Sequence, residues 1–119
     1  MTAAVLYGCE NVRVEQVPIP KIGPDEVLVR VEVALTCGTD LKVWKRGYHA
    51  RMITPPALFG HELAGTVVAA GADVRNVGEG IRVVPANSAP CGECFYCRAG
   101  QPNLCADLLF NNGAYAQYL

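Results

Sequence analysis

Four of the chain's six cysteines lie between residues 91 and 105, in the spacing Cys-x2-Cys-x2-Cys-x7-Cys. They are Cys91, Cys94, Cys97 and Cys105. Short x2 separations allow neighbouring thiolates to reach one ion at about 2.3 Å each, and four such ligands make the closed tetrahedral site typical of structural zinc. The spacing therefore predicts a structural zinc lobe over about residues 90–107.

Disulfides, an iron–sulfur cluster and inert buried thiols are the alternatives to zinc at these four cysteines. Disulfides need an oxidising compartment, and the N-terminal sequence has no export-signal pattern. An iron–sulfur cluster shares the first two spacings, but the bacterial pattern continues with x3-Cys-Pro, whereas here seven residues precede Cys105 and Ala106 follows it. Inert buried cysteines are expected singly and not as a regular quartet. We therefore predict zinc ahead of all three.

The composition limits the kind of protein that this chain can be. Its 119 residues are 51% hydrophobic and 18% charged, which is typical of one folded domain and not of disorder. A net charge of -1 gives no basic excess for nucleic acid or for an anionic membrane surface. No apolar run approaches the length of a membrane span. We expect neither partner, and without an export signal we expect a cytoplasmic protein.

Strand patterns dominate the sequence. Residues 25–34 place valines at every second position, and residues 3–7 and 11–17 suit a hairpin. Further strands are expected at 64–71 and 80–86, a short helix at 39–46 and a single helical turn inside the lobe. The last residues, GAYAQYL, alternate like a strand and then stop, which we interpret as a fragment cut within its architecture. Many short strands predict a mainly β fold, a small barrel or sandwich.

A second group of potential metal ligands lies outside the lobe. Cys37 follows the valine-rich strand, and His61 and Glu62 occur in FGHELAG. Singly, such a Cys is usually a small core residue and such a His a surface or hydrogen-bonded one. Together, a thiolate, an imidazole and a carboxylate are ligands that zinc accepts, and three protein ligands with a free fourth position define a catalytic site. Spacing alone does not establish that they converge.

The chain resembles the N-terminal, GroES-like domain of the zinc-dependent medium-chain dehydrogenases, the relatives of alcohol, polyol and threonine dehydrogenases. The resemblance covers essentially residues 1–119 and rests on CGTD at 37–40, GHELAGTVVAAGADV at 60–74 and CGECFYCRAGQPNLC at 91–105, in the expected order. It implies one GroES-like domain, a partly open β-barrel with short helices and a zinc-binding lobe. It also implies one catalytic zinc beside the structural one.

The resemblance assigns roles to individual residues. Cys37 and His61 match ligands of the catalytic zinc, and Glu62 matches the carboxylate beside it; a further ligand is expected beyond residue 119. Thr39 matches the hydroxyl that hydrogen-bonds the substrate oxygen and relays its proton. Asp40 matches a position near that relay and behind the zinc ligands, although it could instead only cap the short helix.

Two departures from the family pattern concern other positions. The family commonly has Gly-Asp-Arg-Val where this chain has Gly-Ile-Arg-Val at 80–83, which concerns a local turn contact. Lys42 stands where several polyol and threonine relatives carry His, so the substrate is not assigned.

The chain contains no Gly-x-Gly-x-x-Gly, the usual dinucleotide-binding pattern. The resemblance places the NAD(P)-binding Rossmann domain after these residues, so we expect an NAD- or NADP-dependent alcohol dehydrogenase as the parent enzyme and no activity from this chain alone. As a full-length enzyme it is expected to act on a small alcohol and to form a homodimer or homotetramer. A non-enzymatic zinc-binding structural or interaction module is the alternative.

Overall fold

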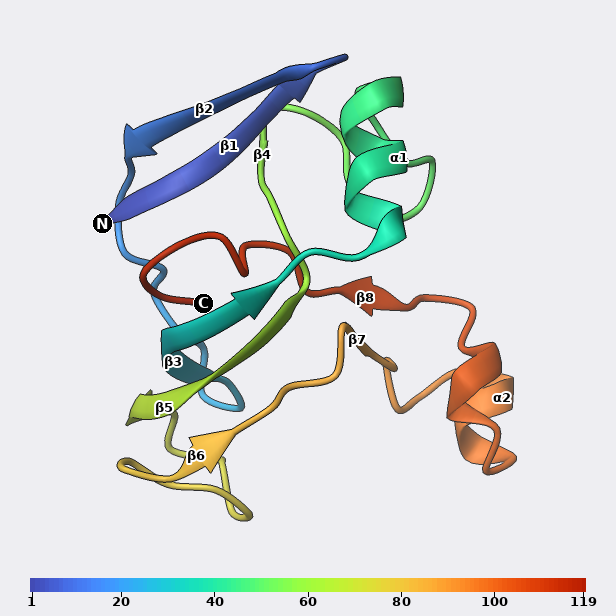
Figure 1. Ribbon diagram of the computed structural model, residues 1–119. Coiled ribbons are helices and arrows are strands. Elements are labelled where there is room, and N and C mark those ends of the chain that lie inside the picture. Colours follow the sequence, from blue (N-terminus) through green and yellow to red (C-terminus); the bar gives the residue numbers. More distant parts are fainter.

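The strands of this protein are joined by long connections with little helix, as a computed structural model of residues 1–119 shows (Figure 1). The elements in chain order are β1 (Thr2–Gly8), β2 (Asn11–Gln16), β3 (Val27–Leu35), α1 (Gly38–Arg46), β4 (Ala57–Leu58), β5 (Glu62–Ala70), β6 (Arg82–Val83), β7 (Ser88–Ala89), α2 (Phe95–Arg98), the 3-10 helix η1 (Pro102–Leu104) and β8 (Leu109–Phe110). The predicted mainly β fold with short helices is confirmed. No helix is long and apolar enough to cross a bilayer.

Three antiparallel sheets organise the chain. They have the orders β2-β1-β4, β3-β5-β6 and β7-β8, and none of them closes into a barrel. The segment Gly113–Leu119 runs between the first two sheets (Figure 1): Ala4 N–H donates to the Tyr115 carbonyl, and Val29 and Leu119 exchange backbone hydrogen bonds. The C-terminal segment therefore joins the two larger sheets.

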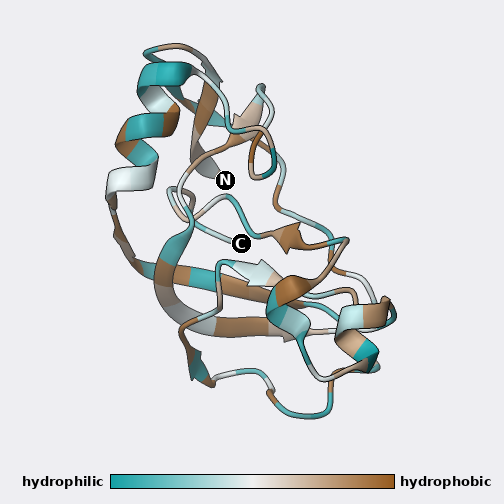
Figure 2. Cartoon of the chain, turned by 90° about the vertical axis from the view of Figure 1, so that its right-hand side faces the viewer, coloured by the Kyte–Doolittle hydropathy of each residue, from teal (hydrophilic) through white to brown (hydrophobic).

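Each of the larger sheets has its own small hydrophobic core. Leu6, Val43, Ile53 and Phe59 form the core between the first sheet and α1. The core of the second sheet consists of Val29, Leu63, Val67 and Ala114. Hydrophobic and hydrophilic residues alternate along the middle of β3 (Figure 2), and buried residues alternate with partly buried ones along the first part of β5, as expected when one sheet face is buried.

Several sequence-based elements are confirmed and others are wrong in detail. The hairpin, the valine-rich strand and the helical turn in the lobe are present, and the helix expected at 39–46 is α1. The strand expected at 80–86 is only Arg82–Val83, and GAYAQYL forms isolated bridges rather than a strand. Val33 is 54% exposed although it shares the valine alternation, because the last four residues of β3 are exposed on both faces of the strand.

Gly65 marks the closest approach of β3 and β5. A Cβ at this position would overlap the Arg30 carbonyl oxygen and lie 2.7 Å from Val29 Cγ1. We expect Gly65→Ala to lower the free energy of unfolding by about 1–3 kcal/mol, because the strands must separate to admit the methyl group. Thermal unfolding measures this. Gly78→Ala is the matched control, since a Cβ there meets nothing within 4 Å. Equal melting temperatures of the two variants would contradict the packing argument.

Candidate metal centres

The four lobe cysteines meet around one point. Their sulfurs all lie within 4.8 Å of one another, and none forms a disulfide. The Sγ atom of Cys105 is 3.5 Å from that of Cys91 and 4.0 Å from that of Cys94. Tetrahedral ligands at about 2.3 Å from zinc stand about 3.8 Å apart, so this donor set fits a zinc ion.

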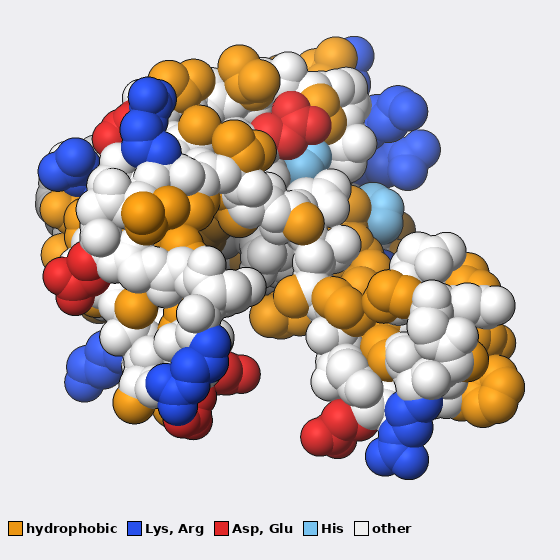
Figure 3. Space-filling view, turned by 90° about the horizontal axis from the view of Figure 1, so that it is seen from below, with side chains coloured by type: hydrophobic (Ala, Val, Ile, Leu, Met, Phe, Trp, Pro, Cys, Tyr) orange, Lys and Arg blue, Asp and Glu red, His pale blue; other side chains and the backbone are white.

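The lobe has almost no hydrophobic core. Among residues 90–107 only Cys105 is buried, and Phe95 is 78% exposed. In the view from below, the lobe stands out from the body with hydrophobic side chains on its surface (Figure 3). Residues 90–107 therefore lack the buried apolar area that normally holds a segment folded, and the four converging sulfurs are the main candidates for doing so.

Two of the lobe thiols, Cys94 and Cys97, differ in pKa. A hydrogen bond from the Ala106 backbone lowers the pKa of the Cys94 thiol to about 6. Desolvation, reinforced by neighbouring Cys94, raises the pKa of the Cys97 thiol to about 12. Sulfurs this close disfavour ionisation of one another, so the first thiolate forms easily and the next with difficulty. The positive charge of a divalent cation would offset this repulsion between neighbouring thiolates.

The start of α1 positions Cys37. Cys37 is the N-cap of the helix: its Sγ accepts a hydrogen bond from Thr39 N–H at 3.2 Å, and its own N–H donates to Asp40 Oδ2 at 2.9 Å. These reciprocal bonds form a capping box, which fixes the thiol at the helix terminus. At the other end Gly47, in the left-handed region, stops the helix.

His61 immediately precedes β5 and lies close to Cys37. Leu35 at the end of β3 pairs with Glu62 at the start of β5, so the chain just beyond Leu35, which includes Cys37, runs beside His61. Cys37 Sγ is 3.3 Å from His61 Nε2, close to the separation of about 3.6 Å expected for sulfur and nitrogen ligands of one zinc. The His61 side chain is 6% exposed.

Asp40 holds the other side of the imidazole. Its Oδ1 is 3.2 Å from His61 Nδ1, and its side chain is 3% exposed. A carboxylate can only accept here, so Nδ1 carries the proton and the Nε2 lone pair is free toward Cys37. Asp40 thus caps the helix and also orients His61. The sequence left a helix cap and a position behind the zinc ligands as alternatives for Asp40, and both contacts are present.

Glu62 completes a group of three potential ligands. Its Oε1 is 4.0 Å from His61 Nε2, with the side chain 43% exposed, and the ligand atoms of Cys37, His61 and Glu62 all lie within 4.8 Å of one another. Thr39 is next to this group through its bond to the Cys37 sulfur, and its hydroxyl has no hydrogen-bond partner in the chain. The structure therefore brings together every residue that the sequence placed at this second site.

One residue of the network was missed from the sequence. The Tyr115 hydroxyl lies 3.0 Å from Asp40 Oδ2, and burial, with the nearby Asp40 adding to it, raises the pKa of Tyr115 to about 12. The phenol is therefore protonated at neutral pH. Nothing in the pattern GAYAQYL pointed to this contact, which spans 75 residues.

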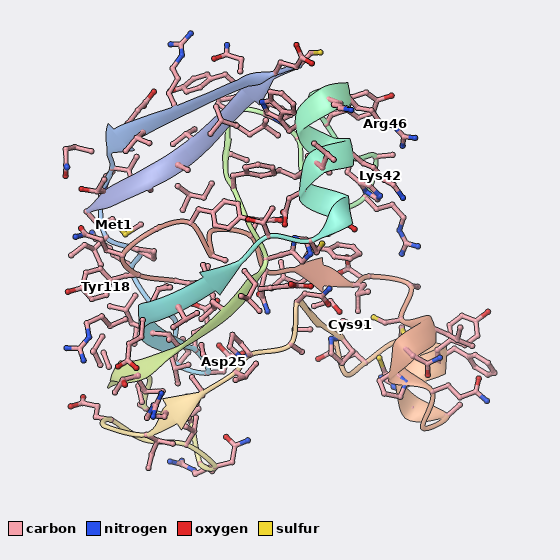
Figure 4. The ribbon with its side chains drawn as sticks, viewed as in Figure 1. Met1, Asp25, Lys42, Arg46, Cys91 and Tyr118 are labelled. Atoms are coloured by element: carbon pink, nitrogen blue, oxygen red, sulfur yellow. The ribbon has the colours of Figure 1, made fainter.

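The two ligand groups are separate in space. Figure 4 places Cys91 at the lobe, away from the helix that carries Lys42 and Arg46 and begins next to Cys37.

Residues 23–119 match the family of the alcohol dehydrogenase GroES-like domain. The chain belongs to this family. The resemblance inferred from CGTD, the GHE motif and the four cysteines is confirmed, as is the GroES-like fold.

Several known dehydrogenases are similar to this GroES-like chain. Sorbitol dehydrogenase of Bombyx mori is 42% identical over 106 residues, 88% of this chain and 30% of that protein. L-threonine 3-dehydrogenase of Chelativorans sp. (strain BNC1) is 40% identical, over 92% of this chain and 33% of that protein. A Sinorhizobium meliloti 1021 structure described as a zinc-binding dehydrogenase bound to NADP has a TM-score of 0.83 and 38% identity, covering 99% of this chain and 35% of its own. The chain thus spans about a third of these relatives.

Proposed function

We propose that this chain is the zinc- and substrate-binding domain of a zinc-dependent, NAD(P)-dependent alcohol dehydrogenase, or of a polyol- or threonine-type dehydrogenase. The observation that carries the proposal is the presence of two separate ligand groups, one of four sulfurs and one of three mixed ligands. The dehydrogenase relatives support the reaction class.

The four lobe cysteines are proposed to hold a structural zinc. Four thiolates fill a tetrahedral ion, so no position is left for a substrate. The role of this ion is to stabilise the lobe, whose residues are mostly exposed. Because the lobe has so little buried apolar area, its folding is coupled to metal binding.

Cys37 and His61 are proposed as ligands of the catalytic zinc, with a further protein ligand outside these residues. Glu62, the more exposed carboxylate beside them, is the group that water or substrate would replace on the ion, so that one position is left for the substrate. Zinc at this position supplies Lewis-acid polarisation of an alcohol oxygen. Asp40 keeps the proton of His61 on Nδ1, so that Nε2 stays available as a ligand. The Thr39 hydroxyl has no hydrogen-bond partner in the chain, so its Oγ1 is free to accept the proton of a substrate hydroxyl while its own proton passes to water.

The nicotinamide site is proposed to lie outside these residues. The chain has no Gly-x-Gly-x-x-Gly, and its relatives are about three times its length. The NADP in the Sinorhizobium meliloti structure supports a nicotinamide cofactor of either kind, NAD or NADP. On this proposal the 119 residues alone do not transfer hydride. Cytoplasmic location and a homodimeric or homotetrameric state stay predictions.

The zinc content of the intact protein distinguishes this proposal from a non-enzymatic zinc-binding module. We expect about two zinc ions per chain, because the two ligand groups are separate. Cys37→Ala is expected to lower the count to about one, since it removes a ligand from the second group only. Elemental analysis of purified protein measures this. A count of one that Cys37→Ala leaves unchanged would favour the module.

A further inference from the structure

The hydroxyl of Tyr115 contacts three oxygens. It lies 3.0 Å from Asp40 Oδ2, 2.9 Å from Thr36 Oγ1 and 3.1 Å from the Leu35 carbonyl. All three oxygens belong to residues 35–40, from the end of β3 to the first turn of α1, whereas Tyr115 belongs to the C-terminal segment. The hydroxyl therefore connects this segment to the residues that flank Cys37.

The chemistry of these groups fixes the direction of the hydrogen bonds. A phenol has one proton, and a carboxylate and a carbonyl can only accept it. Bonds to an ionised acceptor are about twice as strong as neutral ones, so the proton of Tyr115 goes to Asp40. The Thr36 hydroxyl can donate as well as accept, and it gives its proton to Tyr115. The resulting chain runs from Thr36 to Tyr115 to Asp40.

Asp40 divides its two oxygens between the helix and the histidine. Oδ2 accepts from Cys37 N–H at 2.9 Å and from Tyr115, while Oδ1 faces His61 Nδ1 at 3.2 Å. Two donors on Oδ2 prevent the carboxylate from rotating. The plane of the carboxylate, and with it the position of Oδ1 opposite the imidazole, is therefore set partly by Tyr115.

The Tyr115 ring is itself held firmly. It packs edge-on against Phe59 with centroids 5.5 Å apart, and its backbone N–H donates to the Phe59 carbonyl. Gly60, with φ of 84°, lies beneath the ring, where a Cβ would be 2.8 Å from Tyr115 Cδ1. The glycine before His61 thus permits both a left-handed backbone and the close approach of the ring.

We propose that Tyr115 is a positioning residue for the second metal centre, acting through Asp40 to fix the tautomer and orientation of His61. This inference rests on the proposed function, because it takes His61 Nε2 as a zinc ligand. Residues behind metal ligands typically change metal affinity by about 10–100-fold when lost. We expect the loss of the Tyr115 hydroxyl to have an effect at the lower end of this range, because Asp40 would still accept a hydrogen bond from the Cys37 amide.

Tyr115→Phe in the intact protein tests the inference. The substitution keeps the ring packing and removes only the hydroxyl. We expect the zinc ion that Cys37→Ala removes to be lost to a competing chelator at about 10-fold lower chelator concentration, with the other zinc unaffected. Tyr118→Phe is the matched control, because the Tyr118 hydroxyl has no hydrogen-bond partner in the chain and no change is expected there.

A second measurement detects the tautomer directly, without activity. Nitrogen-15 spectra of the histidines, taken after removal of the zinc that Cys37 binds, should show His61 as one Nδ1–H tautomer in the parent and as a mixture in Tyr115→Phe. Unchanged zinc affinity together with an unchanged tautomer would overturn the inference. If Tyr115→Phe is unstable, the parent protein still tests it, because a mixture of His61 tautomers in the parent would overturn the inference equally.

Asp40→Asn separates failure of this inference from failure of the proposed function. If it weakens zinc binding and Tyr115→Phe does not, only the role of Tyr115 is wrong. If neither Asp40→Asn nor Cys37→Ala changes the zinc content or affinity, the second metal centre itself is wrong.

Discussion

His61→Ala in the intact enzyme is expected to abolish turnover, with a loss of at least about a thousandfold. The residue is the only imidazole among the three proposed ligands, and its Nε2 lies 3.3 Å from Cys37 Sγ. Loss of several kcal/mol of charge stabilisation by the metal corresponds to a rate factor of this size. Zinc content should fall by about one ion per chain.

The stability of the His61→Ala protein should fall only modestly. Asp40, with 3% of its side chain exposed, loses the donor to Oδ1 but keeps Cys37 N–H and Tyr115. We expect a cost of about 1–3 kcal/mol, measured by thermal unfolding alongside the rate assay. His49→Ala is the matched control, since His49 accepts only from the backbone of its own loop. Retained activity in His61→Ala would refute the assignment.

Cys94→Ser is expected to unfold the lobe and to remove the other zinc ion. Zinc binding in small zinc-dependent domains is worth about 10–16 kcal/mol, and the lobe has only one buried residue to replace it. A serine hydroxyl is a poor substitute for a thiolate ligand. Zinc content should therefore fall by about one per chain, while the body of the domain, with its two separate cores, stays folded.

Limited trypsin digestion gives a local readout of this unfolding. Arg98, in α2, is the only Lys or Arg between residues 83 and 119, so cleavage there reports the lobe alone. We expect slow cleavage in the parent and rapid cleavage in Cys94→Ser. Cys9→Ser is the control, because Cys9 lies outside both ligand groups. Unchanged zinc content and unchanged protection in Cys94→Ser would show that the quartet is not structural.

The second metal centre illustrates the limit of sequence reasoning. Cys37 and His61 are 24 residues apart, and only the family resemblance suggested that they meet. The structure explains the meeting: β3 and β5 pair antiparallel with Leu35 opposite Glu62, which brings the link from β3 to α1, where Cys37 is the N-cap, close to the residue before β5. Register between strands depends on the packing of whole strands, including the two shifts in this ladder, and a local pattern does not contain it.

The sequence by itself determined the four-cysteine lobe, because its ligands lie within fifteen residues and short spacings almost dictate the geometry of the site. It also determined the family, through motifs that are contiguous. Only the tertiary structure decided the two contacts of Asp40 and the place of Tyr115. These contacts join β3, α1, β5 and the C-terminal segment, whose relative positions follow from sheet pairing and core packing over the whole chain.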